Sequence, residues 1–170
     1  MEEIDITPAL LDKARQNSRY IVRNKSASIR GGDGAFIGSI GTAIVADYYG
    51  VSVVDSEQWT VAAYDMVIDG DKIEVKTKQR SVPPKHYYEA SVTTQSLHVL
   101  DPDYFIFVSL LNLDKAFIMG AIEVNEFYDK ATRLSAGDID PSNNYVVRKD
   151  CLNIAYSELG DYDKVATARR

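Results

Sequence analysis

The chain has 170 residues, 45% of them apolar and 26% charged, with a net charge of −6 at neutral pH. This composition is ordinary for one folded domain with its own core, and the negative charge argues against a protein that coats nucleic acid non-specifically. No apolar run approaches membrane-spanning length, the acidic start is unlike a secretory signal, and the single cysteine, Cys151, excludes an internal disulfide; we expect a cytoplasmic protein with no membrane partner.

The first third of the chain predicts two helices joined by a polar loop. Thr7 can cap a helix that begins at Pro8, and apolar residues recur at helical spacing up to residue 22. Residues 24–34 are polar and rich in glycine, which indicates a loop. A second helix is expected over 35–49, closed by a glycine.

A β-hairpin is predicted next, with strands over 59–69 and 72–78. Asp69-Gly70 is a strong turn signal between two runs rich in Val, Ile and aromatic residues. With Gly70 and Asp71 at the tip, Asp65 faces Lys76 across the two strands. The hairpin is followed by a loop through Pro83-Pro84.

The remaining elements predict an α/β fold with a mixed central sheet. Residues 104–111 form a nearly continuous apolar run, the mark of a strand covered on both sides. The other elements expected are a short helix over 93–100 capped by Thr93, a strand over 116–122, a helix over 126–132, and short strands over 145–147 and 152–156.

Three charged residues of the hairpin are the candidate site. Side chains alternate along a strand, so the expected register places Asp65, Glu74 and Lys76 on one face. Two carboxylates and an ammonium on one face suit a magnesium ion with a cationic neighbour. The alternative is a surface hairpin in which Asp65 and Lys76 form a cross-strand ion pair. Against it, the buried strand that follows would make the hairpin central, where charges are costly unless paired or bound to metal.

Asp65 followed by Glu74-Val75-Lys76, within this order of elements, resembles the PD-(D/E)xK phosphodiesterase superfamily. The resemblance covers residues 34–111, with a weaker likeness up to residue 159, and it implies a restriction-endonuclease-like core flanked by helices. On this division of a single domain, residues 1–33 form an N-terminal helix and loop, 34–111 the nuclease core, and 112–170 C-terminal strands and helix.

The resemblance also implies roles for individual residues. Asp65, Glu74 and Lys76 would be catalytic, and Asp65, Glu74 and the carbonyl of Val75 would hold Mg²⁺, for which Mn²⁺ can substitute. The stretch from Gly38 to Ala43 is similar to a family helix in which a glutamate helps to hold the metal. Thr42 stands at that glutamate's position, and Asp47 is a distant substitute. Gln95 matches an auxiliary polar residue, although an ordinary solvent-facing glutamine is the plainer interpretation. The two glycines of this stretch, Gly38 and Gly41, would let another backbone approach closely.

Basic residues after the hairpin are candidates for contact with DNA. Lys78, Arg80 and Lys85 fall, with Lys76, in ten residues that contain no acid. A solvated strand end is the alternative to phosphate contact. The neighbouring pair Tyr87-Tyr88 is expected to pack within the protein or to line an interface; stacking on DNA bases is the alternative.

The sequence therefore predicts a Mg²⁺-dependent DNA endonuclease, either acting alone or as a homodimer cutting two strands. It would work in the cytoplasm, or in the host cytoplasm if phage-encoded. The alternative function is a non-catalytic module that retains the nuclease fold and binds nucleic acid or protein. A third hypothesis, an interaction protein with no role on nucleic acid, predicts no salt-sensitive DNA binding.

Overall fold

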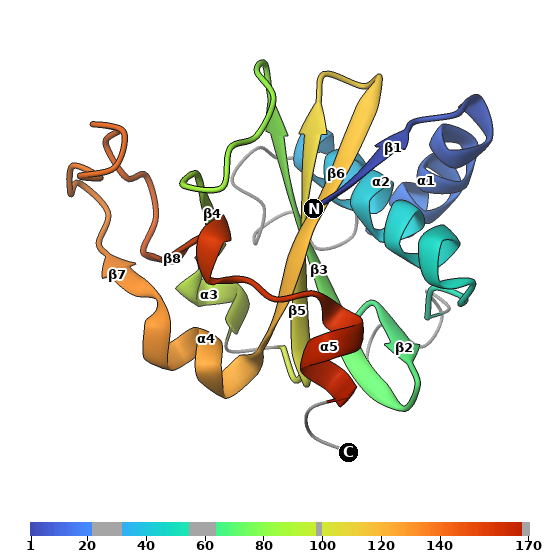
Figure 1. Ribbon diagram of the computed structural model, residues 1–170. Coiled ribbons are helices and arrows are strands. Elements are labelled where there is room, and N and C mark those ends of the chain that lie inside the picture. The colour runs from blue at the N-terminus through green and yellow to red at the C-terminus, as the bar shows by residue number, and fades with distance from the viewer. Residues whose placement is uncertain (22–31, 55–63, 98–99, 168–170) are drawn as a thin grey trace.

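The computed structural model of the protein describes residues 1–21, 32–54, 64–97 and 100–167. Its centre is a five-stranded mixed sheet in the order β1-β6-β5-β3-β2 (Figure 1). Only β3 and β5 are parallel neighbours; the other pairs are antiparallel. The strands are β1 (Glu2–Asp5), β2 (Met66–Ile68), β3 (Asp71–Arg80), β5 (Tyr104–Leu111) and β6 (Lys115–Glu123).

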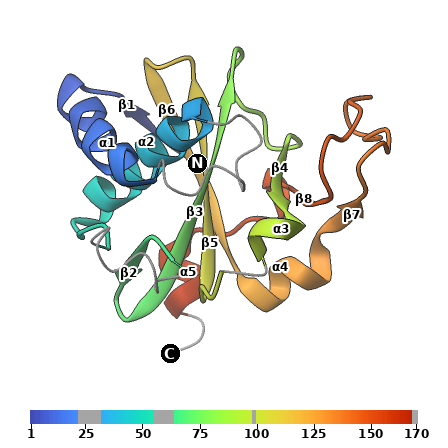
Figure 2. The ribbon, with the colours of Figure 1, turned by 180° about the vertical axis from the view of Figure 1, so that it is seen from behind.

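Two helices, α1 (Pro8–Ile21) and α2 (Gly32–Tyr49), cover one face of this sheet, as opposite views agree (Figure 1, Figure 2). Alternation along the strands explains the two buried faces. Ile106, Val108 and Leu110 of β5 pack in the cluster that holds the helices, while Phe105 and Phe107 belong to a second cluster. Because β5 is buried on both faces, it forms the middle of the molecule.

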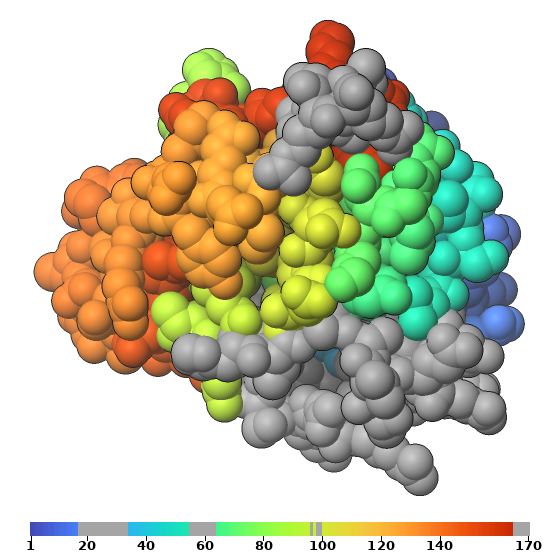
Figure 3. Space-filling model, turned by 90° about the horizontal axis from the view of Figure 1, so that it is seen from below, coloured from blue at the N-terminus to red at the C-terminus, as the bar shows by residue number. Residues whose placement is uncertain are grey.

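The second face is covered by a three-stranded antiparallel sheet in the order β4-β8-β7. Its strands are accompanied by α3 (Thr94–Leu97), α4 (Val124–Lys130) and a 3-10 turn, η1 (Tyr156–Glu158). Seen from below, the start of β5 lies between α4 on one side and the β2–β3 turn on the other (Figure 3). The strands of this sheet are β4 (Glu89–Thr93), β7 (Thr132–Leu134) and β8 (Cys151–Ala155).

The C-terminal segment returns to the central sheet. Ala121 of β6 and Gly160 exchange two backbone hydrogen bonds of 2.7 and 2.9 Å. Helix α5 (Tyr162–Thr167) then places Tyr162, only 3% exposed, with its hydroxyl 3.0 Å from the carbonyl oxygen of Ile68 and 3.1 Å from a carboxylate oxygen of Asp71. This tyrosine ties the C-terminal segment to the hairpin.

The expected α/β architecture with a mixed central sheet is present, but several elements differ from the prediction. Residues 89–92, expected as loop, and Thr93, expected as the cap of a helix, form β4, and the helix begins at Thr94. Residues 145–147 form no strand, only one isolated bridge from Val146 to Ile139. The expected loop over 24–34 and the start of the first hairpin strand fall largely outside the described residues. In the described part of the chain, no helix is both long and apolar enough to cross a membrane.

Candidate functional site

The β2–β3 hairpin turns at Asp69-Gly70, which corrects the expected tip at Gly70-Asp71. Both residues have positive φ, 53° and 97°, as a two-residue hairpin turn requires. The pairs are Ile68–Asp71, Val67–Lys72 and Met66–Ile73. The paired register ends at Met66, so the expected pairing of Asp65 with Lys76 is not observed. Asp65 lies just before the paired residues, with its amide bonded to the Ile73 carbonyl oxygen, and strand alternation therefore does not fix the face on which it lies.

Asp65 lies immediately before β2 and is held by the backbone of β3. Its amide donates a hydrogen bond to the carbonyl oxygen of Ile73 (2.8 Å), and its carboxylate accepts one from the amide of Val75 (2.8 Å). The residue is only 8% exposed. The main chain of β3 thus fixes the position of a buried carboxylate.

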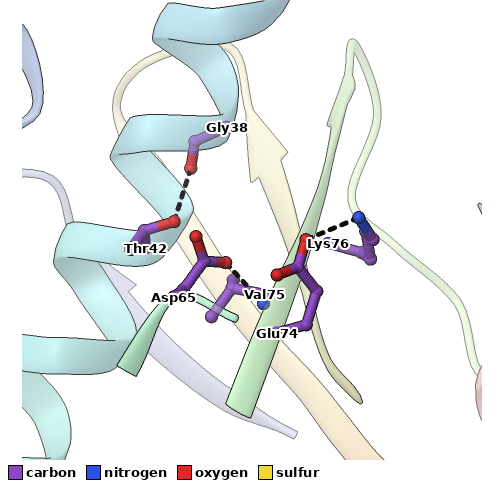
Figure 4. Close-up of polar contacts among 6 residues, drawn as sticks. All are labelled: Gly38, Thr42, Asp65, Glu74, Val75 and Lys76. Carbon is purple, nitrogen blue, oxygen red and sulfur yellow. Dashed lines mark hydrogen bonds and ion pairs between the residues drawn. The ribbon is translucent and has the colours of Figure 1, made fainter. Parts of the chain in front are cut away.

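Glu74 and Lys76 lie on the face of β3 that is turned away from α2. They stand level with Phe105 and Phe107 of β5, whose rings belong to the second cluster. Glu74 is 8% exposed, and its carboxylate accepts a hydrogen bond from the Lys76 ammonium at 2.7 Å. In Figure 4 the carboxyl groups of Asp65 and Glu74 lie on either side of the Val75 amide, with Lys76 beyond Glu74.

The two carboxyl groups are close enough to affect each other. Burial raises the pKa of Asp65 well above the ordinary value for aspartate, and the charge of Glu74 raises it further. The hydrogen bond from Val75 and the charge of Lys76 act in the opposite direction, lowering this pKa. A cation bound between the carboxylates would relieve both the repulsion and the cost of burying their charge.

The donor set fits one hard divalent ion and does not complete a larger site. Carboxylate oxygens are the ligands that Mg²⁺ prefers, together with water. Across the described residues, no group of three or more His, Cys, Asp or Glu side chains is arranged to hold a metal. Asp47, the distant substitute for a third acid, is exposed on α2 and pairs with Lys13 at 2.7 Å. Asp65 and Glu74 are therefore the acidic ligands that the hairpin offers.

Helix α2 is brought against the site by a glycine. A Cβ at Gly41 would lie 1.9 Å from Oγ1 of Thr77, so only glycine allows this approach to β3. Of the residues that the structure describes, none comes within 4 Å of a Cβ at Gly38, so among them only Gly41 of the two glycines has the expected close neighbour. Thr42 follows Gly41, is buried, and donates a hydrogen bond to the Gly38 carbonyl (3.2 Å) on the side of α2 turned toward Asp65 (Figure 4).

Lys78 and Arg80 continue the face of β3 that carries Glu74 and Lys76. Burial of its ammonium, with the nearby charge of Arg80, lowers the pKa of Lys78, whose ammonium donates to the carbonyl oxygen of Glu89 (3.3 Å). Arg80 donates to the same carbonyl (2.9 Å) and to the hydroxyl of Tyr156 (3.2 Å). Its half-buried guanidinium thus links β3 to β4 and to the 3-10 turn. Contact of these two residues with DNA stays a prediction.

Tyr88 and Tyr156, the aromatic partners of Arg80, were missed by sequence reasoning. The Arg80 guanidinium lies 4.8 Å from the centre of the Tyr88 ring and 5.5 Å from that of Tyr156. Nothing in the local pattern could pair Arg80 with a tyrosine 76 residues further along the chain.

Lys85 and Gln95 lie on elements other than those that carry Asp65 and Glu74. Lys85 is exposed in the loop between β3 and β4, with its ammonium 5.6 Å from the centre of the Tyr87 ring. Gln95 is exposed on α3. Figure 1 shows α3 on the side of the central sheet away from α1 and α2. The structure does not bring either residue together with Asp65 and Glu74 through any described contact.

Two hollows in the described surface are lined by other residues than Asp65, Glu74 and Lys76. One, of about 110 Å³, lies between Tyr49, Gly120 and Tyr162. The other, of about 540 Å³, lies between the loop before β4 and the segment around Tyr156. The candidate metal site at the base of the hairpin therefore lies outside both of these hollows.

No model of a known protein family matches the chain, and no curated protein sequence matches it. The resemblance to PD-(D/E)xK enzymes therefore stays a prediction from the sequence. At the level that the fold and the site define plainly, the chain is a mixed α/β protein with a cluster of two carboxyl groups and one ammonium beside its central sheet.

Proposed function

We propose that this protein is a Mg²⁺-dependent DNA endonuclease with a restriction-endonuclease-like core. The observation that carries the proposal is the position of Asp65, Glu74 and Lys76. Two nearly buried carboxyl groups flank the Val75 amide, and Lys76 is paired with one of them at 2.7 Å. Two like charges placed this close together beside a sheet destabilise the fold, because each raises the free-energy cost of burying the other.

In this proposal Asp65 and Glu74, with the carbonyl of Val75, hold the ion. When bound, Mg²⁺ polarises the scissile phosphate and lowers the pKa of a bound water. The hydrogen bond from Val75 holds Asp65 in place before any ion enters. Lys76, whose ammonium donates a hydrogen bond to the Glu74 carboxylate, supplies positive charge next to the phosphate. Its role is therefore stabilisation of negative charge that develops on the phosphate oxygens.

DNA is the proposed partner, with Lys78 and Lys85 as phosphate contacts and Arg80 behind them. Mn²⁺ is the proposed substitute for Mg²⁺. A homodimer would allow two strands to be cut, and the cytoplasm, or a host cytoplasm for a phage-encoded chain, is the proposed compartment.

A non-catalytic binding module with the same fold is the second candidate. The observation that favours it is Thr42, which stands on α2 where a third acid would complete the ligand set. Its hydroxyl is already used by the Gly38 carbonyl. This module would bind DNA without cutting it.

A cleavage assay with matched variants separates the two candidates. Plasmid, branched and single-stranded DNA are incubated with the protein in Mg²⁺, in Mn²⁺ and in chelator. We expect cleavage with either metal, and a loss of about 10²–10³-fold in rate for Asp65→Asn and for Lys76→Ala. Asp47→Asn removes an exposed acid on α2, away from the hairpin. It is the control and should cut at the normal rate. The proposal fails if wild type leaves every substrate uncut, or if Asp65→Asn cuts as fast as wild type.

A further inference from the structure

The larger hollow, of about 540 Å³, combines an aromatic loop with a cation. Pro84, Lys85, His86 and Tyr87 line it from the loop before β4, and Tyr156 and Ser157 from the 3-10 turn. Tyr87 is 56% exposed, the highest exposed fraction among the tyrosines that the structure describes as exposed. The described residues that line the hollow include no acid, although the chain as a whole carries a net charge of −6.

The aromatic rings of the loop form a connected row. His86 meets Tyr87 edge to face at 5.6 Å between ring centres, and Tyr87 meets Tyr88 in the same way at 5.1 Å. Tyr88 in turn covers the guanidinium of Arg80 at 4.8 Å. The exposed Tyr87 is thus supported from behind by contacts that reach the central sheet.

A row of positive charge connects this loop with the candidate metal site. Lys76, Lys78 and Arg80 lie at every second position of β3 and therefore share one face. This row of cations starts next to Glu74 and ends at Arg80, which contacts the Tyr88 ring. At about 3.3 Å per residue, Lys76 and Arg80 are roughly 13 Å apart along the strand. A few nucleotides of single-stranded DNA can span this distance.

We propose that the hollow binds an unpaired nucleobase of single-stranded DNA, stacked against Tyr87 with its phosphate at Lys85. Aromatic rings interleaved with cations are the usual means of holding single strands, because every base has a face on which a ring can stack. A duplex would not fill the hollow, since its bases are already stacked on each other. As a statement about substrate, the inference rests on the proposed nuclease function: DNA with an unpaired segment next to the cut would be preferred. As a statement about binding, it is independent of hydrolysis.

The test is fluorescence anisotropy with a short labelled oligothymidylate and a matched duplex, both in chelator so that no metal-dependent step contributes. We expect Tyr87→Ala to weaken binding of the single strand about 5- to 150-fold, the range for loss of one stacked base, and to leave duplex binding almost unchanged. Tyr87→Phe should bind nearly as well as wild type. Lys85→Gln should flatten the salt dependence of single-strand binding by about 0.7 in log–log slope.

Tyr145→Ala is the control, because Tyr145 is also exposed (49%) and also has a cation, Arg148, 5.8 Å from its ring centre, but does not line the hollow. Equal binding of an oligouridylate would support the same base site. Equal loss in Tyr87→Ala and Tyr145→Ala, or wild-type binding by Tyr87→Ala, would overturn the inference. Cleavage measured separately distinguishes the two proposals: an inactive wild type with Tyr87-dependent single-strand binding removes the nuclease and keeps the site.

Discussion

The contact between α2 and β3 gives a sharp prediction through two glycines of the same helix. Replacing glycine by alanine inside a helix gains about 0.5–1 kcal/mol of stability when nothing opposes the methyl group. At Gly38 no residue in the described part of the chain comes within 4 Å of the new Cβ, so Gly38→Ala should show this gain. At Gly41 the new Cβ would lie 1.9 Å from Oγ1 and 3.0 Å from Cβ of Thr77.

Such overlap cannot be relieved by one short, branched side chain, so the overpacking cost of about 1–3 kcal/mol applies at its upper end. Gly41→Ala should therefore destabilise the protein by about 2–2.5 kcal/mol after the helix gain is subtracted. Urea unfolding of both variants measures this difference. In a double-mutant cycle, Thr77→Ala should recover most of the loss, because it removes Oγ1 and the methyl group. If Gly41→Ala is as stable as Gly38→Ala, the close packing of α2 on β3 is refuted.

Three further predictions concern stability. Asp140 is 5% exposed; burial raises its pKa, but hydrogen bonds from Ser142 and Asn143 outweigh this and leave the pKa lowered. A group with a lowered pKa stabilises the fold at pH values above its unfolded pKa of about 3.9, so Asp140→Asn should cost about 1.5–3 kcal/mol at neutral pH. When unfolding is measured at decreasing pH, this difference should disappear as pH falls through the folded pKa. A difference that does not depend on pH would contradict the assignment. Tyr162→Phe removes a hydroxyl 3.0 Å from the Ile68 carbonyl and should cost about 1 kcal/mol in urea unfolding, whereas no change would show that this hydroxyl does not hold the C-terminal segment. Gly120 has φ 144°, and a Cβ there would lie 2.7 Å from the Gly160 carbonyl oxygen, so Gly120→Ala should cost about 1–3 kcal/mol and speed amide exchange at Gly160; normal exchange there would refute the pairing.

The parts of the fold that sequence predicts well are those with a strong local pattern. The strand over 104–111 was predicted with the observed ends because it is apolar on both faces, and α1 begins at the proline expected to open it. Strand β4 was missed because its partner β8 lies some sixty residues later, and no local signal records that pairing. The short strand expected near Tyr145 fails for a related reason: its alternation is present, but it has no partner beyond one bridge.

The composition of the candidate site was predictable, and so was the tip of its hairpin. The Asp-Gly dipeptide favours a two-residue turn with Asp69 and Gly70 at its centre, as observed, and the expected tip was placed one residue too late. The face of Asp65 could not be derived from strand alternation, because the paired residues end at Met66 and the amide of Asp65 bonds the Ile73 carbonyl oxygen. The surroundings of Arg80 could not be foreseen, since Tyr88 and Tyr156 reach it from different elements.

The central claim is that Asp65 and Glu74 together hold one divalent ion. The most direct measurement is a calorimetric titration of the metal-stripped protein with Mn²⁺, compared with Asp65→Asn, which keeps an oxygen for the Val75 amide but loses the charge. We predict one ion per chain for wild type and an affinity lowered more than about tenfold in the variant, since a lost ligand should cost at least as much as a lost supporting contact. Absence of binding to wild type, or equal affinity in Asp65→Asn, would contradict the account.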